Sequence, residues 1–514
     1  MRIRLNFAAL SILLVVSGIL ARDTVYLYPG NPFRDSVQAY PESTTFIVKE
    51  GTHYQPRIWP KTGDHFIGED GAVMDGGDTA YHAIVGNQTV DDIVIRNIRF
   101  LNYGSAPRLC VITARADAYN GARWTIENCE FGYCNGGAIM IGDSFEVRGN
   151  YIHHMGQIGL LGGATGSLVE NNEIAFCNYE MENSFIFEAG GAKFAYATNL
   201  IVRGNYVHDN FGPGLWTDID NMNILYEGNI IEDNLQFGIF HEISYDAVIR
   251  CNVIRNNGAA HDSLVWWMKP GQIKIANSQN TEICHNIIEV HPSFGDGIAL
   301  SNAVRGEDWY CRDNSVHHNH IIHKGKNASY SGINGVESEW HEEFENLYTQ
   351  ADNRFDANYY HVPDDTTRYW FWRGTRWDHT GNGFRTFEEF QAMGQEQHGI
   401  IDHDTGGSYA CAPCQDLVDR IETARKICPG RIAQQGLRVG ATARDGNCVV
   451  KITGNCAPPV EICIHDARGR RVSRILVGHE VQRIVVPTSS LGRGMYLVRA
   501  HASGMTAVTT FVVR

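Results

Sequence analysis

A short motif centred on asparagine recurs along the chain and constrains its fold more than any other feature. The motif reads apolar, any residue, polar or Gly, a marked position, any residue, apolar, as in VRGNYI (Val147–Ile152) and IRCNVI (Ile249–Ile254). The marked residues are Ile98, Cys129, Asn150, Asn172, Asn205, Asn229, Asn252, Asn286 and Asn319. The spacings between them are either 21 to 24 or 31 to 34 residues, so that the longer ones fit one extra loop.

A period in the low twenties with β-type local patterning predicts an all-β solenoid in which each coil is one turn of chain. Neighbouring coils then stack at the inter-strand distance of about 4.8 Å. Asn at equivalent places can pass amide hydrogen bonds along the stack, and it tolerates the left-handed bend between strands. Leucine-rich repeats have a similar period, but their Leu framework is missing here.

On these repeats the chain resembles a right-handed parallel β-helix protein of the pectate-lyase-like superfamily. We expect the β-helix to span residues 22–336, followed by a mixed capping region and linker at 337–436. The resemblance implies a protein that acts on a polysaccharide along an outward parallel face. The Gly-His-Gly of the polygalacturonase type and the Arg-x-x-Pro-x-x-Arg of the pectate-lyase type are both missing, so neither subfamily is assigned.

The first 21 residues predict export. They combine a basic start, an apolar run from Leu5 to Val16 and small residues up to Ala21, as a secretory signal peptide does. The run is shorter than the roughly 20 apolar residues that a membrane span needs. No later segment is apolar enough to cross a bilayer, so we expect a secreted or cell-surface protein without a transmembrane span in its mature form.

Charge and cysteine content narrow the partners further. The formal net charge of −15 argues against nucleic acid as a partner. Thirteen cysteines in an exported chain permit disulfides. The CAPC sequence (Cys411–Cys414) has no second pair and no βαβ context, so we expect a local crosslink near the end of the solenoid rather than a redox or zinc site.

Residues 437–514 change to alternating strands and predict a small C-terminal β-sandwich domain. The segments IHDARGRRV (Ile464–Val472), LGRGMYLVRA (Leu491–Ala500) and FVVR (Phe511–Arg514) resemble the C-terminal sorting domain of type IX secretion substrates. The resemblance implies the secretion machinery as a partner of this domain. The Asn-Pro opening usual in that family is absent, and an ordinary immunoglobulin-like module stays open as the alternative.

A second strand of each coil begins with Gly, and aligning these strands suggests a site. The central copies GAKFA (Gly191), GLWTD (Gly214) and GIFHE (Gly238) interrupt a series that is otherwise apolar. Because side chains alternate along a strand, one face collects Lys193, Trp216, Asp218, Phe240 and Glu242. Trp next to carboxylates does not fit a core, so we expect this face to point outward.

Asp218 and Glu242 are one coil apart, which places their β-carbons about 5 Å from each other. Such a pair is stabilised if one acid stays protonated, if a cation such as Ca²⁺ is bound with help from Asp220, or if Lys193 compensates. Trp216 and Phe240 offer flat apolar faces of the kind that stack on sugar rings. Together these features predict a carbohydrate-active site.

Two reactions fit these residues. Hydrolysis needs one protonated and one ionised carboxyl group, for which Asp218 and Glu242 are the candidates. β-Elimination needs a base, and Lys193, His241 or Tyr245 are the candidates, with Ca²⁺ on Asp218, Asp220 and Glu242. Strand alternation favours an inward His241 unless the strand bends at Glu242. A non-catalytic, glycan-binding surface protein is the alternative function.

Further histidines accompany the asparagine motif on many coils: His153, His154, His208, His317, His318, His320 and His323. They are spread along the chain and do not converge in the sequence, so we expect surface or turn positions rather than a metal site.

Overall fold

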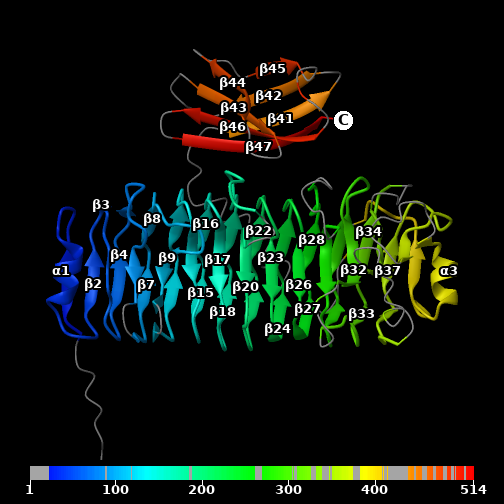
Figure 1. Ribbon diagram of the computed structural model, residues 1–514, viewed down its shortest axis with the longest axis horizontal. Helices are drawn as coiled ribbons and strands as arrows, with labels where there is room; N and C mark the ends of the chain where they lie inside the picture. Colours follow the sequence, from blue (N-terminus) through cyan, green and yellow to red (C-terminus); the bar gives the residue numbers. More distant parts are fainter. Residues whose placement is uncertain are drawn as a thin grey trace, which may run out of the picture.

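The computed structural model describes most of the chain from Arg22 onward (Figure 1). It covers residues 22–407 except for 87–88, 117–118, 185–187, 261–268, 304, 306–308, 326–330, 339–346, 348–349 and 374–382. It also covers Tyr409, Cys414 and Leu491, and seven strands between 438 and 513. The predicted signal peptide, residues 1–21, lies outside this part. Within the described residues, no helix has the length and apolar character needed to cross a membrane.

Three long sheets of parallel strands run along the solenoid, and each coil contributes one strand to each sheet. Sheet A consists of β1 (Thr24–Leu27), β2 (Thr45–Val48), β4 (His65–Gly68), β7 (Val94–Arg96), β12 (Thr125–Glu127), β15 (Glu146–Arg148), β18 (Leu168–Glu170), β21 (Ile201–Arg203), β24 (Met222–Glu227), β27 (Tyr245–Arg250), β30 (Glu282–Cys284), β33 (Ser315–His317) and β36 (Arg354–Asp356).

Sheet B follows sheet A in every coil. It consists of β3 (Gly51–Tyr54), β5 (Ala72–Asp75), β8 (Arg99–Leu101), β13 (Glu130–Gly132), β16 (Tyr151–His153), β19 (Glu173–Ala175), β22 (Tyr206–His208), β25 (Ile230–Glu232), β28 (Val253–Arg255), β31 (Ile287–Val290), β34 (His320–His323), β37 (Tyr359–His361) and β40 (Ile400–Asp402).

Sheet C completes the coils and carries the strands that begin near a glycine. It consists of β6 (Ile84–Val85), β9 (Cys110–Thr113), β14 (Gly137–Met140), β17 (Ile158–Gly162), β20 (Gly190–Phe194), β23 (Leu215–Asp218), β26 (Ile239–Glu242), β29 (Gly271–Ala276), β32 (Asp296–Asn302), β35 (Asn334–Ser338), β38 (Trp370–Arg373) and the antiparallel β39 (Phe384–Arg385). A short hairpin pairs β10 (Arg115–Ala116) with β11 (Tyr119–Asn120).

The inward side chains of the three sheets form one continuous apolar core. Ile152, Ile174 and Val207 occupy equivalent places on successive coils and are fully buried. This in-register stacking is why the same short motif recurs with apolar residues at its ends. The predicted all-β parallel solenoid is confirmed.

The predicted asparagine ladder is present and longer than the sequence motif. On each step, Oδ1 of one Asn accepts hydrogen bonds from the backbone N–H and the Nδ2 of the Asn before it, as Asn252 does from Asn229 at 2.9 Å each. The ladder runs from Asn150 through Asn319 to Asn358, and the Asn358 amide then donates to the buried carboxylate of Glu396. Side-chain amides thus tie each coil to the next.

We expected the ladder asparagines themselves to adopt the left-handed bend, but the bend lies one residue earlier. Asn171, Cys251 and His285, which precede Asn172, Asn252 and Asn286, have φ of 55°, 58° and 56°. The backbone therefore turns just before each ladder Asn, whose amide is left to bond along the stack.

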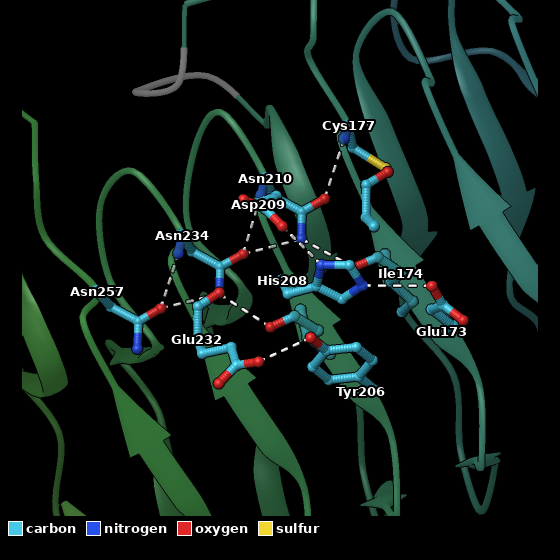
Figure 2. Close-up of polar contacts among 12 residues, drawn as sticks. Glu173, Ile174, Cys177, Tyr206, His208, Asp209, Asn210, Glu232, Asn234 and Asn257 are labelled. Carbon is cyan, nitrogen blue, oxygen red and sulfur yellow. Dashed lines mark hydrogen bonds and ion pairs between the residues drawn. The ribbon is translucent and has the colours of Figure 1, made fainter. Parts of the chain in front are cut away.

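A second, shorter ladder lies at the corner between sheets B and C. Figure 2 shows Asn210, Asn234 and Asn257 passing hydrogen bonds along the stack, with the first also accepting from the N–H of Cys177. Asn257 Nδ2 donates to Oε1 of Gln272 at 3.0 Å, which ends the row. The sequence motif did not reveal this ladder because only three coils share it.

Parallel pairing continues beyond residue 336, where the repeat becomes hard to recognise. β36, β37 and β38 add to sheets A, B and C, and β40 adds to sheet B at Ile400–Asp402. Helix α1 (Phe33–Gln38) lies at the N-terminal end and buries Phe33 and Val37. Helix α3 (Phe387–Ala392) lies at the other end, where Phe390 packs against Phe355 and Trp370.

The predicted local crosslink at CAPC is wrong for Cys414. This residue forms a disulfide with Cys251, 163 residues earlier in the sequence. The chain after β40 returns along the coils, since Tyr409 stacks on the ring of His361 at 3.6 Å between centroids. The disulfide therefore attaches the returning segment to the middle of the solenoid.

The C-terminal strands form two antiparallel sheets. One contains β41 (Arg438–Arg444), β42 (Asn447–Thr453) and β45 (Arg483–Pro487). The other contains β44 (Arg471–Val477), β43 (Val460–Asp466), β46 (Gly494–Ala502) and β47 (Met505–Val513). β41 contacts β47 across the two sheets, which gives the small sandwich that the alternating pattern predicts.

We predict that Asn252→Ala lowers the free energy of unfolding by about 1–3 kcal/mol, because it leaves buried donors on Asn229 without their acceptor. The measurement is chemical denaturation followed by circular dichroism. Asn223→Ala is the matched control, since Asn223 is exposed and its side chain bonds to that of another surface residue, Asn199. Equal stability of the two variants would contradict the ladder's role.

Candidate functional site

The outer face of sheet C carries two columns of side chains, aromatic and charged among them, across its central coils. Strand pairing aligns Lys193, Trp216, Phe240 and Lys274 in one column. It aligns Asp218, Glu242, Ala276, Ser301 and Glu337 in the other. Asp218 and Glu242 are direct partners on adjacent strands β23 and β26, so their β-carbons lie about 5 Å apart.

Strand alternation separates these residues from the solenoid core. Leu215 and Ile239 belong to the continuous core inside the coils. Trp216 and Phe240 belong to a different apolar cluster, together with Phe211, Leu235 and Phe237. The two columns therefore point outward from the coil.

Outward does not mean exposed at this face. Trp216 is 3% and Phe240 1% exposed, because Tyr179, Met181 and Ala260 from neighbouring loops pack against their cluster. Their rings stack on each other at 5.3 Å between centroids. This corrects the expectation of an open aromatic platform for sugar rings, since both faces are covered by protein.

Lys193 holds the first carboxylate of the pair. Its Nζ lies 2.8 Å from Oδ2 of Asp218 and 3.8 Å from the centroid of the Trp216 ring. The Asp218 side chain keeps 11% of its surface exposed. The ion pair and the cation–π contact fix both charged groups at the rim of the buried cluster.

Glu242 lies deeper and has a different charge environment. Glu242 is 1% exposed, and its Oε1 accepts a hydrogen bond from the guanidinium of Arg305. Burial, and then the charge of Asp218, raise the pKa of Glu242 to about 7, against the opposing effect of Arg305 and Lys193. The two neighbouring carboxyls therefore differ in environment, and Glu242 holds its proton more strongly than an ordinary Glu.

A second ion pair between a lysine and a carboxylate on the same face was not predicted. Nζ of Lys274 bonds Oε1 of Glu337, and both side chains are 1% exposed. Aligning the next strand by its first glycine would match Gly271 with Gly238, but the structure pairs Ile273 with Ile239 and so places Gln272 opposite Gly238. Gln272 takes the place of a glycine because its side chain ends the second asparagine ladder. Correcting this one-residue slip moves Lys274 into the outward column.

Arg305 was also missed, for a different reason. It follows β32 in a loop rather than in a strand, so no repeat predicts its position. Its side chain is 37% exposed and reaches Glu242 from 63 residues further along the chain.

His241 points into the coil, as strand alternation favours. It is therefore not available as a base at the outer face, which was one of the roles expected for it. The residue is fully buried and Nδ1 lies 2.7 Å from the Thr217 hydroxyl. The Tyr226 hydroxyl donates to Thr217 in turn. Burial lowers the pKa of His241 to about 3, so the imidazole is neutral and belongs to the core.

The remaining predicted residues lie at the edge of the site. Asp220 is exposed and has φ of 53°, which places it in the turn after β23. Tyr245 opens β27 in sheet A and is partly buried. Tyr196 was not predicted; it is 65% exposed, and its N–H donates at 2.9 Å to the carbonyl of Ile219, the residue after Asp218. Tyr196 is thus an exposed aromatic residue next to the turn that follows Asp218.

Access to the pair is narrow in this structure. Two hollows of about 320 and 330 Å³ lie elsewhere, at the C-terminal end beside Phe355 and near the N-terminal end beside Ile98. Among the described residues, three potential metal ligands converge at Glu282, Cys284 and His317 and not at Asp218, Asp220 and Glu242. Binding of Ca²⁺ by these three acids stays a prediction.

Sheet B carries a separate charged cluster around His208 (Figure 2). Nδ1 lies 2.8 Å from Asp209 and Nε2 lies 3.3 Å from Glu173. Burial lowers the pKa of His208, but these two carboxylates raise it more, to about 9. A cationic, fully engaged imidazole of this kind ties neighbouring coils together.

Comparison with known proteins supports the fold. A family model for a right-handed β-helix region matches residues 116–269. The A-module of the mannuronan C-5 epimerase AlgE6 of Azotobacter vinelandii is similar, with a TM-score of 0.51 and 13% identity over 72% of this chain and 93% of that one. XylC in complex with xylose has a TM-score of 0.52 and 11% identity over 95% and 100%. No curated protein matches the sequence. The chain is thus a right-handed parallel β-helix, and at these identities the likeness extends to the fold alone.

Proposed function

We propose that this protein is an exported carbohydrate-active enzyme that cleaves a polysaccharide at the Asp218–Glu242 pair. The observation that carries the proposal is this pair of adjacent carboxyls in unlike environments. Pairs of titratable groups whose environments differ in this way are typical of acid–base sites. Two solved β-helix structures of similar fold are named for mannuronan and for xylose, which agrees with a carbohydrate substrate.

Hydrolysis fits the geometry better than β-elimination. The β-carbons of Asp218 and Glu242 lie about 5 Å apart on adjacent strands, which fits the close carboxyl pair of retaining glycosidases better than the wider pair of inverting enzymes. Elimination needs a base at the same place, but His241 is inside the core, Lys193 is engaged with Asp218, and Tyr245 belongs to a strand of sheet A rather than sheet C. Hydrolysis therefore needs only the two adjacent carboxyls and no further base.

In this mechanism Glu242 is the acid and Asp218 the nucleophile. Protonated Glu242 gives its proton to the glycosidic oxygen while Asp218 attacks the anomeric carbon, and the bond to the leaving sugar breaks. Water then attacks the anomeric carbon of the glycosyl ester and gives a proton to the Glu242 carboxylate, which restores both groups. Lys193 orients the Asp218 carboxylate by an ion pair, and Arg305 orients the Glu242 carboxyl by donating a hydrogen bond to its Oε1.

Substrate must approach from the side where Asp218 and Arg305 keep exposed surface. Arg305 covers Glu242, so a bound sugar must displace its guanidinium or bond to it. Tyr196 offers the exposed ring that Trp216 and Phe240 do not, next to the turn after Asp218. We propose Tyr196 as a sugar-contacting residue.

Two assays on a panel of plant, algal and host glycans distinguish hydrolysis from elimination. One measures the release of reducing sugar, and the other measures the absorbance of unsaturated uronates. We expect reducing ends without unsaturated products, and a rate that falls as pH rises above about 7, because Glu242 then loses its proton. Glu242→Gln and Asp218→Asn should each lower kcat by about 10²–10⁴-fold.

Asp246→Asn is the control, since Asp246 is exposed on the following strand and bonds to the side chain of Asn280. Formation of unsaturated products would show that the reaction is elimination and not hydrolysis. Glycan binding without any product would favour the adhesive alternative, and full activity in both carboxyl variants would refute the site.

We further propose that residues 437–514 direct the chain through type IX secretion. The proposal rests on the resemblance of the Ile464–Val472, Leu491–Ala500 and Phe511–Arg514 segments to that sorting domain, and on the antiparallel sandwich formed there. In a bacterium with this pathway, the full chain should reach the surface or medium, and a chain ending at residue 436 should stay in the periplasm. Cell fractionation with an antibody to the β-helix measures this, and equal distribution of both chains would contradict it.

A further inference from the structure

One column on the outer face of sheet A alternates in charge along the solenoid and then changes character. Strand pairing aligns Arg96, Glu127, Arg148, Glu170, Arg203, Glu227 and Arg250, followed by Cys284, His317 and Asp356. The arginines and glutamates form ion pairs between coils, such as Arg203 with Glu170 at 2.9 Å and Arg250 with Glu227 at 2.7 Å. At Cys284 and His317 a thiol and an imidazole replace this pattern on adjacent coils.

Glu282 completes a group of three unlike ligands. Its Oε1 lies 3.1 Å from Nε2 of His317, and one ligand atom each of Glu282, Cys284 and His317 lies within 4.8 Å of the others. Cys284 is 4% exposed, whereas the His317 side chain is 25% and the Glu282 side chain 50% exposed. The three groups therefore converge on a point that is open to solvent on one side.

The flanking groups already have partners of their own. Arg250, on the coil before Cys284, pairs with Glu227. Asp356, on the coil after His317, bonds Nδ1 of His398 at 2.8 Å. Between them, Nδ1 of His317 lies 2.9 Å from Nδ1 of His318. When Nε2 of His317 gives its lone pair to a metal, Nδ1 carries the proton and donates to His318, which fixes the tautomer and the ring orientation.

We propose that Glu282, Cys284 and His317 bind a divalent transition-metal ion of the zinc class. A thiolate and an imidazole select such borderline ions over Ca²⁺ and Mg²⁺, and three protein ligands with one open side leave a position for water. A thiolate and a carboxylate balance the charge of the ion. The metal joins β30 to β33 at the point where the arginine–glutamate pairs end, and it is separate from the carboxyl pair on sheet C. The site uses His317, one of the histidines for which the sequence favoured a surface or turn position over a metal site.

The test uses the full-length protein, stripped with a chelator and dialysed against zinc chloride, with metal content measured by elemental analysis. We expect one zinc per chain. With Co²⁺ we expect the intense near-ultraviolet absorption of thiolate-to-cobalt charge transfer. Cys284→Ser should abolish this band, and His317→Gln should weaken binding by more than the 10- to 100-fold that loss of an outer-shell partner costs.

Two variants with the same change of residue type serve as controls. Cys110→Ser replaces a buried thiol on sheet C, and His65→Gln replaces a histidine several coils away on sheet A. Both should bind zinc as the unchanged protein does. Zinc should also raise the melting temperature of the unchanged protein but not that of Cys284→Ser.

Zinc retention by Cys284→Ser equal to that of the unchanged protein would overturn the proposal, as would a cobalt complex without the charge-transfer band. His317→Gln, whose side chain is partly exposed, keeps the test decisive if the Cys284 variant does not fold, because unchanged metal affinity in that variant would overturn the proposal as well.

Discussion

The register between neighbouring coils is the constraint on which the rest of this structure depends. Residues that are 21 to 39 positions apart in sequence become neighbours only if every coil begins at the same angle. The Asn150–Asn358 ladder fixes that angle, because the Oδ1 of each buried Asn accepts from both the backbone N–H and the side chain of the Asn on the preceding coil. A net contribution of about 0.5–1.5 kcal/mol for each bond, and the larger cost of leaving a buried donor without an acceptor, make a slip of one residue expensive.

Once the register is fixed, the outer faces become charged surfaces with defined partners. On sheet A the columns give rows of arginine–glutamate pairs, and a Cys–His pair where those rows end. On sheet C they give Lys193 with Asp218 and Lys274 with Glu337, with Glu242 between these pairs along its column. The sheet C charges are nearly buried, so their interactions are strong and their desolvation is costly. Such an arrangement is expected where function, rather than stability, requires the groups.

The sequence predicts what repeats and misses what does not. The ladder, the parallel sheets and the alignment of Asp218 with Glu242 follow from spacing alone. The burial of Trp216 does not, because loops of irregular length cover it. Arg305 reaches Glu242 from such a loop. The sequence did not reveal Lys274 as an outward residue, because Gln272 occupies the place where neighbouring coils have a glycine. An alignment by glycines is therefore shifted by one residue at this strand.

The convergence of Cys284 with His317 could have been read from the register but not from the residues one at a time. Each belongs to a motif copy in which the same position is elsewhere Arg or Glu. Only the alternation along the whole column makes the change visible. The spread of the histidines along the chain suggested scattered positions, and two of the others, His153 and His208, bond to neighbouring carboxylates.

The most direct test of this account is the protonation of Glu242, measured by infrared difference spectroscopy of the protonated carboxyl band across a pH titration. Glu242→Gln identifies the band, and Asp218→Asn removes the neighbouring charge. The account predicts a titration near pH 7 in the unchanged protein that moves to lower pH in Asp218→Asn, because the Asp218 charge raises the pKa of Glu242. A titration unaffected by that substitution would mean that the two acids are not neighbours.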